Sequence, residues 1–480
     1  MSAALRLAAA GARVTLVERE PRLGGKAGEW KRSGFRFDTG PSVLTLDEVV
    51  SATFTDAGLE DPLSFRAASP LCRYRYPDGR VWDVYQEVDA TLASLTGRES
   101  DAYLRALRKA RDLYEAAAPL FVYGRAPGLG RLAAYGLRHA LAASPGRSLP
   151  DLLRALGADG PLLGPFFLRF ATYLGADPRR APAVLHNVAW VELGLGVRHP
   201  VGGIYAVVRA LEEALGRLGV ETRLGEGVER LVSHGGRVSE VVTSRGSLRC
   251  DAAVAAVDRA DVLRWLGRAA RSRALSLSGL VLLAGLRSRD TRLARHTIAF
   301  PERYGAEFDD IAAGAHPRDP TLYLNVSVVD EPADAPPGSE NRFVMANAPA
   351  LPPQREAPEV SEARLEAGRQ GLLRSLSERG LAWSEDALVT HRWLGPAEFA
   401  AFGSRGSLYG AAPHGLLGAL RPGPRVAGLA NLTLAGGSVH PGGGVPLAML
   451  SGRNAAESTC AYLGLPAPAG ARAPRPARAR

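Results

Sequence analysis

Two glycine-rich segments near opposite ends of the 480-residue chain hold the residues whose types and spacing could support chemistry. In the first, a short apolar run ends at Glu18, and Gly24-Gly25-Lys26 and then Asp38-Thr39-Gly40-Pro41-Ser42 follow. Dinucleotide folds hold a ribose hydroxyl with a carboxylate at the end of a strand that follows a helix, and glycines let a backbone pass close to a bulky ligand. The segment predicts a nucleotide site, although Glu18 taken alone is equally compatible with an exposed charge.

The second segment lies between Gly436 and Gly444. A predicted strand at 432–435 enters this glycine-rich loop, and a predicted helix at 446–463 leaves it. Amides at a helix N-terminus stabilise negative charge, which a reduced flavin carries near N1 and its C2 carbonyl. The order of strand, loop and helix therefore predicts a flavin site, and the alternative is a flexible glycine loop.

The fingerprint G-x-G-x-x-G is not found upstream of Glu18. In dinucleotide folds it stands about 20 residues before the acidic ribose ligand, and counting back from Glu18 passes the start of the chain. Residues 1–10 are typical of the helix that follows such a loop, with Gly11 as its stop. The first strand and the phosphate loop are thus expected to be missing. A start assigned at an internal methionine and a truncated form both explain this, and we favour the first.

Other kinds of chemistry find no support. Cys72, Cys250 and Cys460 stand far apart, which argues against a disulfide framework or a structural zinc site and suits a reducing cytoplasm. Nine histidines show no H-E-x-x-H spacing, and no G-x-S-x-G elbow occurs, so neither a metal site nor a serine nucleophile is expected. The net charge of +10 is scattered without interleaved aromatic residues, so nucleic-acid binding is not expected either.

The elements that must position the two segments follow from periodicity. Residues 73–84 form a hairpin pattern around Pro77-Asp78-Gly79, and 92–176 are mostly helical. Strands are predicted beside the nucleotide segments at 221–227, 228–233, 237–243 and 252–257. A second sheet is predicted from strands at 275–286, 323–329, 342–347 and 388–392. The apolar segments 116–123 and 160–173 are most simply core helices, and a membrane-facing entrance is the alternative.

The pattern L-R-L-A-x-x-G-x-x-V-T-x-V-E-x-x-x-x-x-G-G-K, followed by F-D-x-G-P-S, resembles the bacterial and fungal phytoene desaturase family of flavoproteins. Residues 435–446 are similar to that family's C-terminal flavin motif. The resemblance covers nearly the whole chain and implies an α/β fold. An FAD-binding, Rossmann-like domain of the glutathione-reductase type would be interleaved with a substrate domain of sheet plus helices. The expected ranges are 1–85, 198–262 and 424–464 for the FAD-binding domain, 86–197 and 263–423 for the substrate and membrane-facing domain, and 465–480 for a disordered tail.

The resemblance also implies roles for individual residues. Glu18 would bind the adenosine ribose, and the backbone at Val228 would receive the adenine. The remaining contacts would be Gly24, Gly25 and Lys26 at the pyrophosphate, Thr39, Gly40, Pro41 and Ser42 at the isoalloxazine, Gly437 and Ser438 at the phosphates and ribitol, and Gly443, Gly444 and Val445 at the pyrimidine edge. His440 is interpreted as a turn histidine with a structural hydrogen bond, with an acid or base as the alternative.

The implied reaction removes two hydrogens from adjacent carbons of a polyene, one as hydride to flavin N5 and the other as a proton. Conjugation stabilises the developing allylic cation, so the protein supplies alignment and an apolar tunnel. No catalytic base can be named from the sequence. Residues 308–349 look most like the subgroup that introduces a 3,4 double bond into hydroxylated carotenoids.

Three alternatives stay open at this point. They are a phytoene desaturase, a flavin amine or porphyrinogen oxidase of similar architecture, and a cofactor-free binding protein that holds carotenoids or a desaturase partner. No run of 18 apolar residues and no signal-peptide pattern occur, which predicts a cytoplasmic protein. A hydrocarbon substrate implies peripheral contact with a membrane surface.

Overall fold

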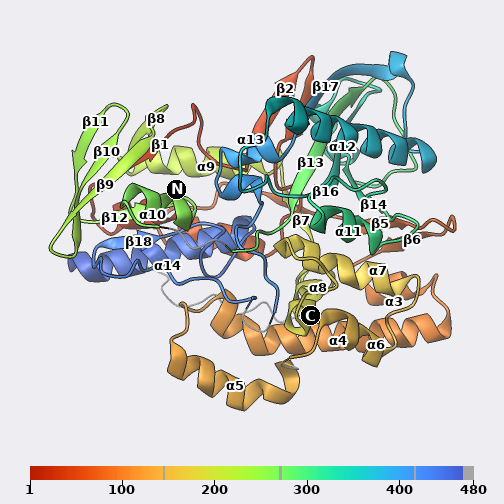
Figure 1. The fold of residues 1–480 in the computed structure, drawn as a ribbon, viewed down its shortest axis with the longest axis horizontal. Coiled ribbons are helices and arrows are strands. Elements are labelled where there is room, and N and C mark those ends of the chain that lie inside the picture. Colours follow the sequence, from red (N-terminus) through yellow and green to blue (C-terminus); the bar gives the residue numbers. More distant parts are fainter. Residues whose placement is uncertain (144–145, 270–272, 416–417, 469–480) are drawn as a thin grey trace.

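The computed structural model describes residues 1–143, 146–269, 273–415 and 418–468, so most of the predicted disordered tail at 465–480 lies outside the described residues. Figure 1 shows three groups of elements. Small parallel strand pairs with flanking helices lie on one side, a larger sheet lies on the other, and a layer of helices lies below.

The two predicted nucleotide segments each include or follow a strand of a parallel pair. β1 (Thr15–Glu18) pairs with β8 (Glu221–Leu224), and β12 (Ala253–Ala255) pairs with β18 (Leu432–Leu434). Glu18 is the last residue of β1, and the glycine loop follows β18, so both nucleotide segments lie at the carboxyl ends of parallel strands. The antiparallel strands beside these pairs are β9 (Val228–His234), β10 (Arg237–Thr243) and β11 (Gly246–Arg249).

Helices α1 (Ser2–Ala9) and α14 (Val445–Leu463) pack against each other, and α14 also packs against β12 and β18. Their contact is close because Gly452 of α14 lies where a Cβ would come within 2.9 Å of Ser2 Oγ. Ser2 Oγ in turn donates a hydrogen bond to the carbonyl oxygen of Met449 at 2.8 Å. The other helices of this side are α2 (Asp47–Thr55), α9 (Tyr205–Arg217) and α10 (Arg259–Trp265).

Seven strands form the larger sheet, in the order β17-β13-β16-β15-β14-β5-β6. They are β5 (Cys72–Arg75), β6 (Val81–Val84), β13 (Ser278–Leu286), β14 (His296–Ala299), β15 (Leu322–Asn325), β16 (Glu340–Ala348) and β17 (Leu388–Leu394). The predicted hairpin β5–β6 forms, but β5 pairs in parallel with β14 and so belongs to this sheet. The predicted range 1–85 for the FAD-binding domain therefore includes two strands of this sheet. A local turn pattern predicts the hairpin β5–β6 but not the pairing of β5 with β14.

The helical layer follows β6 in the chain. Its members are α3 (Val88–Leu92), α4 (Gly97–Ala117), the π-helix η1 (Ala118–Val122), α5 (Leu129–Ala143), α6 (Leu149–Leu156), α7 (Leu163–Leu168), η2 (Arg169–Leu174), η3 (Ala183–His186) and α8 (Asn187–Leu193). Phe166, Phe167 and Phe170 are fully buried, and the ring of Phe166 lies 4.8 Å from that of Trp82 in the sheet. For residues 160–173 the interpretation as core is therefore confirmed.

Shorter elements join the groups. They are the strands β2 (Glu29–Arg32), β3 (Phe35–Asp38), β4 (Phe65–Ala67) and β7 (Arg198–Pro200), the helices α11 (Ala306–Ala312), α12 (Pro358–Glu378) and α13 (Pro396–Ala400), and the turns η4 (Ser327–Val329), η5 (Pro332–Asp334), η6 (Glu385–Ala387) and η7 (Ser404–Gly406). Within the described ranges, none of the helices has both the length and the apolar content to cross a bilayer.

Candidate functional site

One large cavity, of about 2160 Å³, lies where the parallel strand pairs meet the larger sheet and the helical layer. All the residues predicted to contact a flavin dinucleotide line it, namely Glu18, Gly24, Gly25, Lys26, Thr39, Gly40, Pro41, Ser42, Val228, Gly437, Ser438, Gly443, Gly444 and Val445. Sites for ligands of drug size occupy about 300–1000 Å³. This cavity therefore has room for a dinucleotide and a long second molecule together.

The segments 24–26 and 39–42 lie against each other at the cavity wall. A Cβ on Gly40 would come within 2.0 Å of the carbonyl oxygen of Lys26, so only glycine permits this approach. Asp38 anchors the second segment, because its carboxylate accepts hydrogen bonds from the amides of Ile204 and Tyr205 at 3.0 and 3.1 Å, where α9 begins. Burial raises the pKa of Asp38. These contacts hold Thr39 to Ser42 at the cavity.

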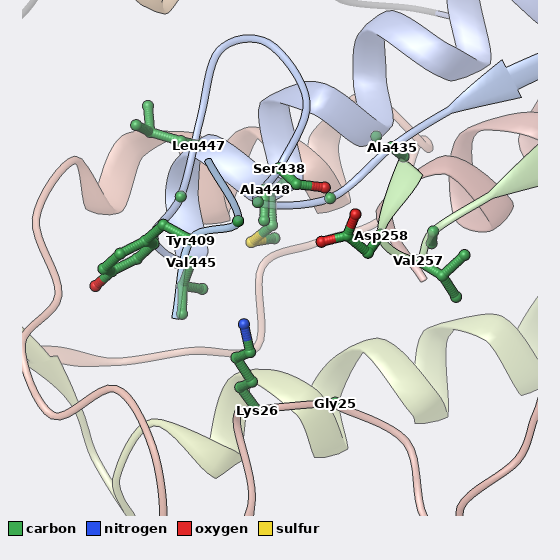
Figure 2. Close-up of a pocket in the computed structure, with 18 of the residues that line it drawn as sticks. Gly25, Lys26, Val257, Asp258, Tyr409, Ala435, Ser438, Val445, Leu447 and Ala448 are labelled. Carbon is green, nitrogen blue, oxygen red and sulfur yellow. The ribbon is translucent and has the colours of Figure 1, made fainter. Parts of the chain in front are cut away.

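Lys26 is the cation of this wall. Its Nζ donates to the carbonyl oxygens of Leu408 and Ser407 at 2.6 and 3.3 Å. Figure 2 shows its amine and the carboxylate of Asp258 pointing into the same space below the glycine loop. Burial lowers the pKa of Lys26 to about 8, and the charge of Asp258 opposes that shift. An anionic ligand here would gain a charge-assisted hydrogen bond.

The glycine loop turns the N-terminus of α14 towards the cavity. No side chain of the described residues caps this helix at Gly444, so its first amides stay available to a ligand. A Cβ on Gly443 would lie 2.1 Å from the Tyr409 ring, which explains the glycine. His440 is buried, and its Nε2 lies 3.0 Å from the carbonyl oxygen of Gly124. That contact matches the structural interpretation of this histidine.

Asp258 and Tyr409 are cavity residues that the sequence did not reveal as site residues. Asp258 directly follows the strand predicted at 252–257, and it caps α10 by accepting from the amide of Ala260 at 3.0 Å. Tyr409 has no motif around it, and it reaches the site because Lys26 holds the two residues before it through their carbonyl oxygens. A charge or a ring brought in by a distant loop leaves no local signal.

The opposite wall of the cavity is mostly apolar, although Arg169 and Asn347 also contribute to it. It is built from the larger sheet and the helical layer, and its lining includes Val184, Leu185, Val188, Leu277, Val281, Ile298, Phe343 and Met345. Several tyrosines interrupt this wall, among them Tyr173, Tyr304 and Tyr323. The described residues contain no cluster of three or more histidine, cysteine, aspartate or glutamate side chains that could hold a metal ion.

Comparison with known proteins agrees with this geometry. Residues 1–284 match the family model described as flavin containing amine oxidoreductase. A phytoene dehydrogenase from Streptomyces griseus is 34% identical over 506 aligned residues, covering 99% of this chain and 95% of that protein. A hydroxyneurosporene desaturase from Rubrivivax gelatinosus is 33% identical, covering 96% and 91%. A solved oxidoreductase from Methanosarcina mazei has the same fold, with a TM-score of 0.63 at 14% identity over 94% of this chain and 96% of that one.

The fold and the comparisons together define an FAD-dependent oxidoreductase with the α/β architecture of the flavin-containing amine oxidoreductases. The uncapped helix, the close-approach glycines and the size of the cavity suit that cofactor. Within this class, the chain belongs to the phytoene desaturase family of carotenoid desaturases. The predictions of the family, of FAD and of the oxidoreductase class are confirmed.

Proposed function

We propose that this protein introduces carbon–carbon double bonds into a long carotenoid polyene, and that the reaction is the 3,4-desaturation of a hydroxycarotenoid. The observation that carries the proposal is the continuity of the cavity, in which the glycine-rich segments face an apolar wall without a partition. The names of the relatives, a phytoene dehydrogenase and a hydroxyneurosporene desaturase, support a polyene substrate. The likeness of residues 308–349 to the 3,4-desaturating subgroup supports the position of the new bond.

When bound, FAD supplies an acceptor for a hydride. In the proposed arrangement, Glu18 binds the ribose, Val228 lies at the adenine, and Gly24, Gly25 and Lys26 contact the pyrophosphate. Gly437 and Ser438 would contact the phosphates and ribitol, while the N-terminus of α14 at Gly443, Gly444 and Val445 would stabilise negative charge at the ring. Thr39, Gly40, Pro41 and Ser42 would lie beside the ring, next to the apolar wall.

The apolar wall has two tasks in this proposal. It binds a hydrocarbon through area removed from water, at about 25 cal/mol per Å², and it excludes water from the reacting carbons. Alignment of a saturated carbon pair with the hydride acceptor then lowers the barrier by proximity. Charged groups are not needed for this alignment, since conjugation spreads the positive charge that develops on the polyene.

The substrate would enter from a membrane surface that helix α5 contacts. Leu132 and Tyr135 of α5 line the cavity, and the Tyr135 ring lies edge-on to that of Phe121 at 4.8 Å. Leu137, on the same helix, is 90% exposed. An exposed helix that joins apolar side chains to arginines is suited to the interface of an anionic bilayer.

The test is turnover by the purified, FAD-loaded protein with liposomes that contain 1-hydroxyneurosporene. The expected product has one more conjugated double bond, seen by chromatography as a red-shifted absorbance. Parallel reactions use phytoene and the diamine putrescine. Conversion of phytoene alone would retain the desaturase and reject the 3,4 assignment, whereas conversion of putrescine alone would reject the carotenoid substrate.

A further inference from the structure

Three side chains form a hydrogen-bonded row that leads from the cavity into the protein core. Ser42 Oγ lies 2.8 Å from Tyr323 Oη, and Tyr323 Oη lies 2.8 Å from His296 Nδ1. Ser42 and Tyr323 line the cavity, whereas His296 is only 2% exposed and lies behind them on β14. The row therefore connects a buried imidazole to the cavity through two hydroxyl groups.

The side chain of Asn325 gives this row a direction. Its amide nitrogen lies 3.2 Å from His296 Nδ1, and with this amide as the donor Nδ1 is an acceptor and the ring carries its proton on Nε2. In that tautomer Tyr323 donates its hydroxyl proton to Nδ1, and Ser42 can donate to Tyr323. Every donor of this arrangement points towards the histidine, which leaves the lone pairs of Ser42 Oγ as the acceptor at the cavity end.

His296 is neutral in this environment. Burial holds the pKa of His296 well below its ordinary value, and the positive charges of Arg295 and Arg169 add to that effect. Among the residues that the structure describes, Nε2 of His296 has no hydrogen-bond partner. A neutral imidazole is able to accept a proton, and a weak base suffices because a hydrogen next to a carbocation is strongly acidic.

We propose that this row accepts the proton that the desaturation releases, an inference that rests on the proposed function. One C–H bond of the saturated pair gives its hydrogen and its electron pair, as hydride, to the flavin, which is the oxidant. The C–H bond on the adjacent carbon breaks, its electron pair becomes the new π bond, and its proton goes to Ser42 Oγ. The proton of Ser42 passes to Tyr323, and that of Tyr323 passes to His296 Nδ1, which becomes an imidazolium.

Two other tyrosines of the cavity lead to carboxylates. Tyr173 donates to Glu192 at 2.8 Å, but that carboxylate is already paired with a buried arginine. Tyr114 reaches Glu48 through a second tyrosine, over distances of 3.0 and 2.8 Å. Hydride and proton leave neighbouring carbons, so the acceptor must lie beside the flavin ring. Ser42 belongs to the segment 39–42 that is proposed to lie there, and this favours its row.

The direction of the row is tested without any turnover. In FAD-loaded protein labelled with [15N]histidine, the His296 signals are assigned by comparison with His296→Gln. NMR at pH 7 should show a neutral ring with its proton on Nε2. Tyr323→Phe should shift the Nδ1 resonance, because its donor is lost, and Tyr304→Phe should not. An imidazolium, or a proton on Nδ1, would overturn the proposal because the donors would then point towards the cavity.

Proton transfer itself is tested with 1-hydroxyneurosporene deuterated at C3 or at C4. Tyr323→Phe should slow turnover by about 10²-fold, within the usual range for lost acid–base catalysis. It should also enlarge the isotope effect at one of the two carbons only, with FAD content unchanged. Tyr304→Phe is the matched control for the isotope effect, since its hydroxyl has no hydrogen-bond partner among the described residues, and it should leave that effect unchanged.

The outcomes separate the two proposals. A wild-type protein that binds FAD and converts no polyene refutes the proposed function and, with it, the need for a proton acceptor. A protein that converts 1-hydroxyneurosporene, in which Tyr323→Phe behaves like Tyr304→Phe, refutes the row alone. An enlarged isotope effect in Tyr114→Phe or Tyr173→Phe, and not in Tyr323→Phe, would move the acceptor to the corresponding carboxylate.

Discussion

Replacement of Lys26 by methionine should weaken FAD binding without destabilising the fold. Methionine keeps the length and most of the volume of the side chain and removes its charge. A hydrogen bond to a charged group contributes about 1.5–3 kcal/mol, so Lys26→Met should weaken FAD binding about 10- to 150-fold. Fluorescence titration of FAD-free protein with FAD measures this change directly.

The pH dependence has a definite sign. In the FAD-free protein, burial lowers the pKa of Lys26 to about 8, and an anionic ligand beside it raises that pKa again. FAD affinity should therefore be highest below pH 8, where Lys26 is already protonated. Above pH 8, binding requires uptake of a proton, and affinity should fall by up to about tenfold per pH unit. Lys26→Met should abolish this dependence.

The stability of the FAD-free protein should rise as the pH increases above 8, whereas the affinity for FAD falls. A folded-state pKa of about 8, against 10.5 for the ordinary group, means that the buried ammonium destabilises the fold. The penalty is at most about 3 kcal/mol, is fully present below pH 8, and disappears as the pH rises to 10.5. At pH 7 the FAD-free Lys26→Met variant should accordingly be harder to unfold in urea than the wild type.

Lys31→Met is the matched control. Lys31 is 63% exposed, pairs with Glu29 at 2.9 Å and lies outside the cavity lining. It should leave FAD affinity, its pH profile and the urea midpoint close to wild-type values. Equal FAD affinity and the same pH profile in the two variants would refute the role assigned to Lys26.

Two further predictions concern membrane contact and the core. Leu137→Asp should reduce co-flotation with anionic liposomes about tenfold or more, because burial of one leucine contributes about 1.5–3 kcal/mol. Val360→Asp, at a position 56% exposed on α12, should not reduce it. Equal losses of co-flotation in the two variants would exclude α5 as the membrane contact. Glu192→Gln should lower the free energy of unfolding in urea by about 3–5 kcal/mol, since it leaves the buried guanidinium of Arg169 unpaired. Glu115→Gln, in an exposed pair, should barely move the midpoint, and a similar shift in both would contradict this reasoning.

Much of the fold was predictable because its signals are local. The strand that ends at Glu18 and the helix after the glycine loop form as predicted, at Thr15–Glu18 and Val445–Leu463. The apolar run of β13 is buried along its whole length, as expected for a strand covered on both faces. The hairpin β5–β6 shows the limit, since its turn is local and its pairing with β14 is not.

The candidate site, too, was predictable from the sequence only in part. By itself, the sequence determined which glycine-rich segments line the cavity, because glycines, a strand-end carboxylate and a helix start are recognisable within a few residues of each other. The tertiary structure alone decided what faces them. Lys26 meets a carbonyl oxygen 382 residues away, and Ser42 meets a tyrosine 281 residues away. Chain folding, not local pattern, creates such contacts, so the environment of Lys26 and the row that ends at His296 exist only in three dimensions.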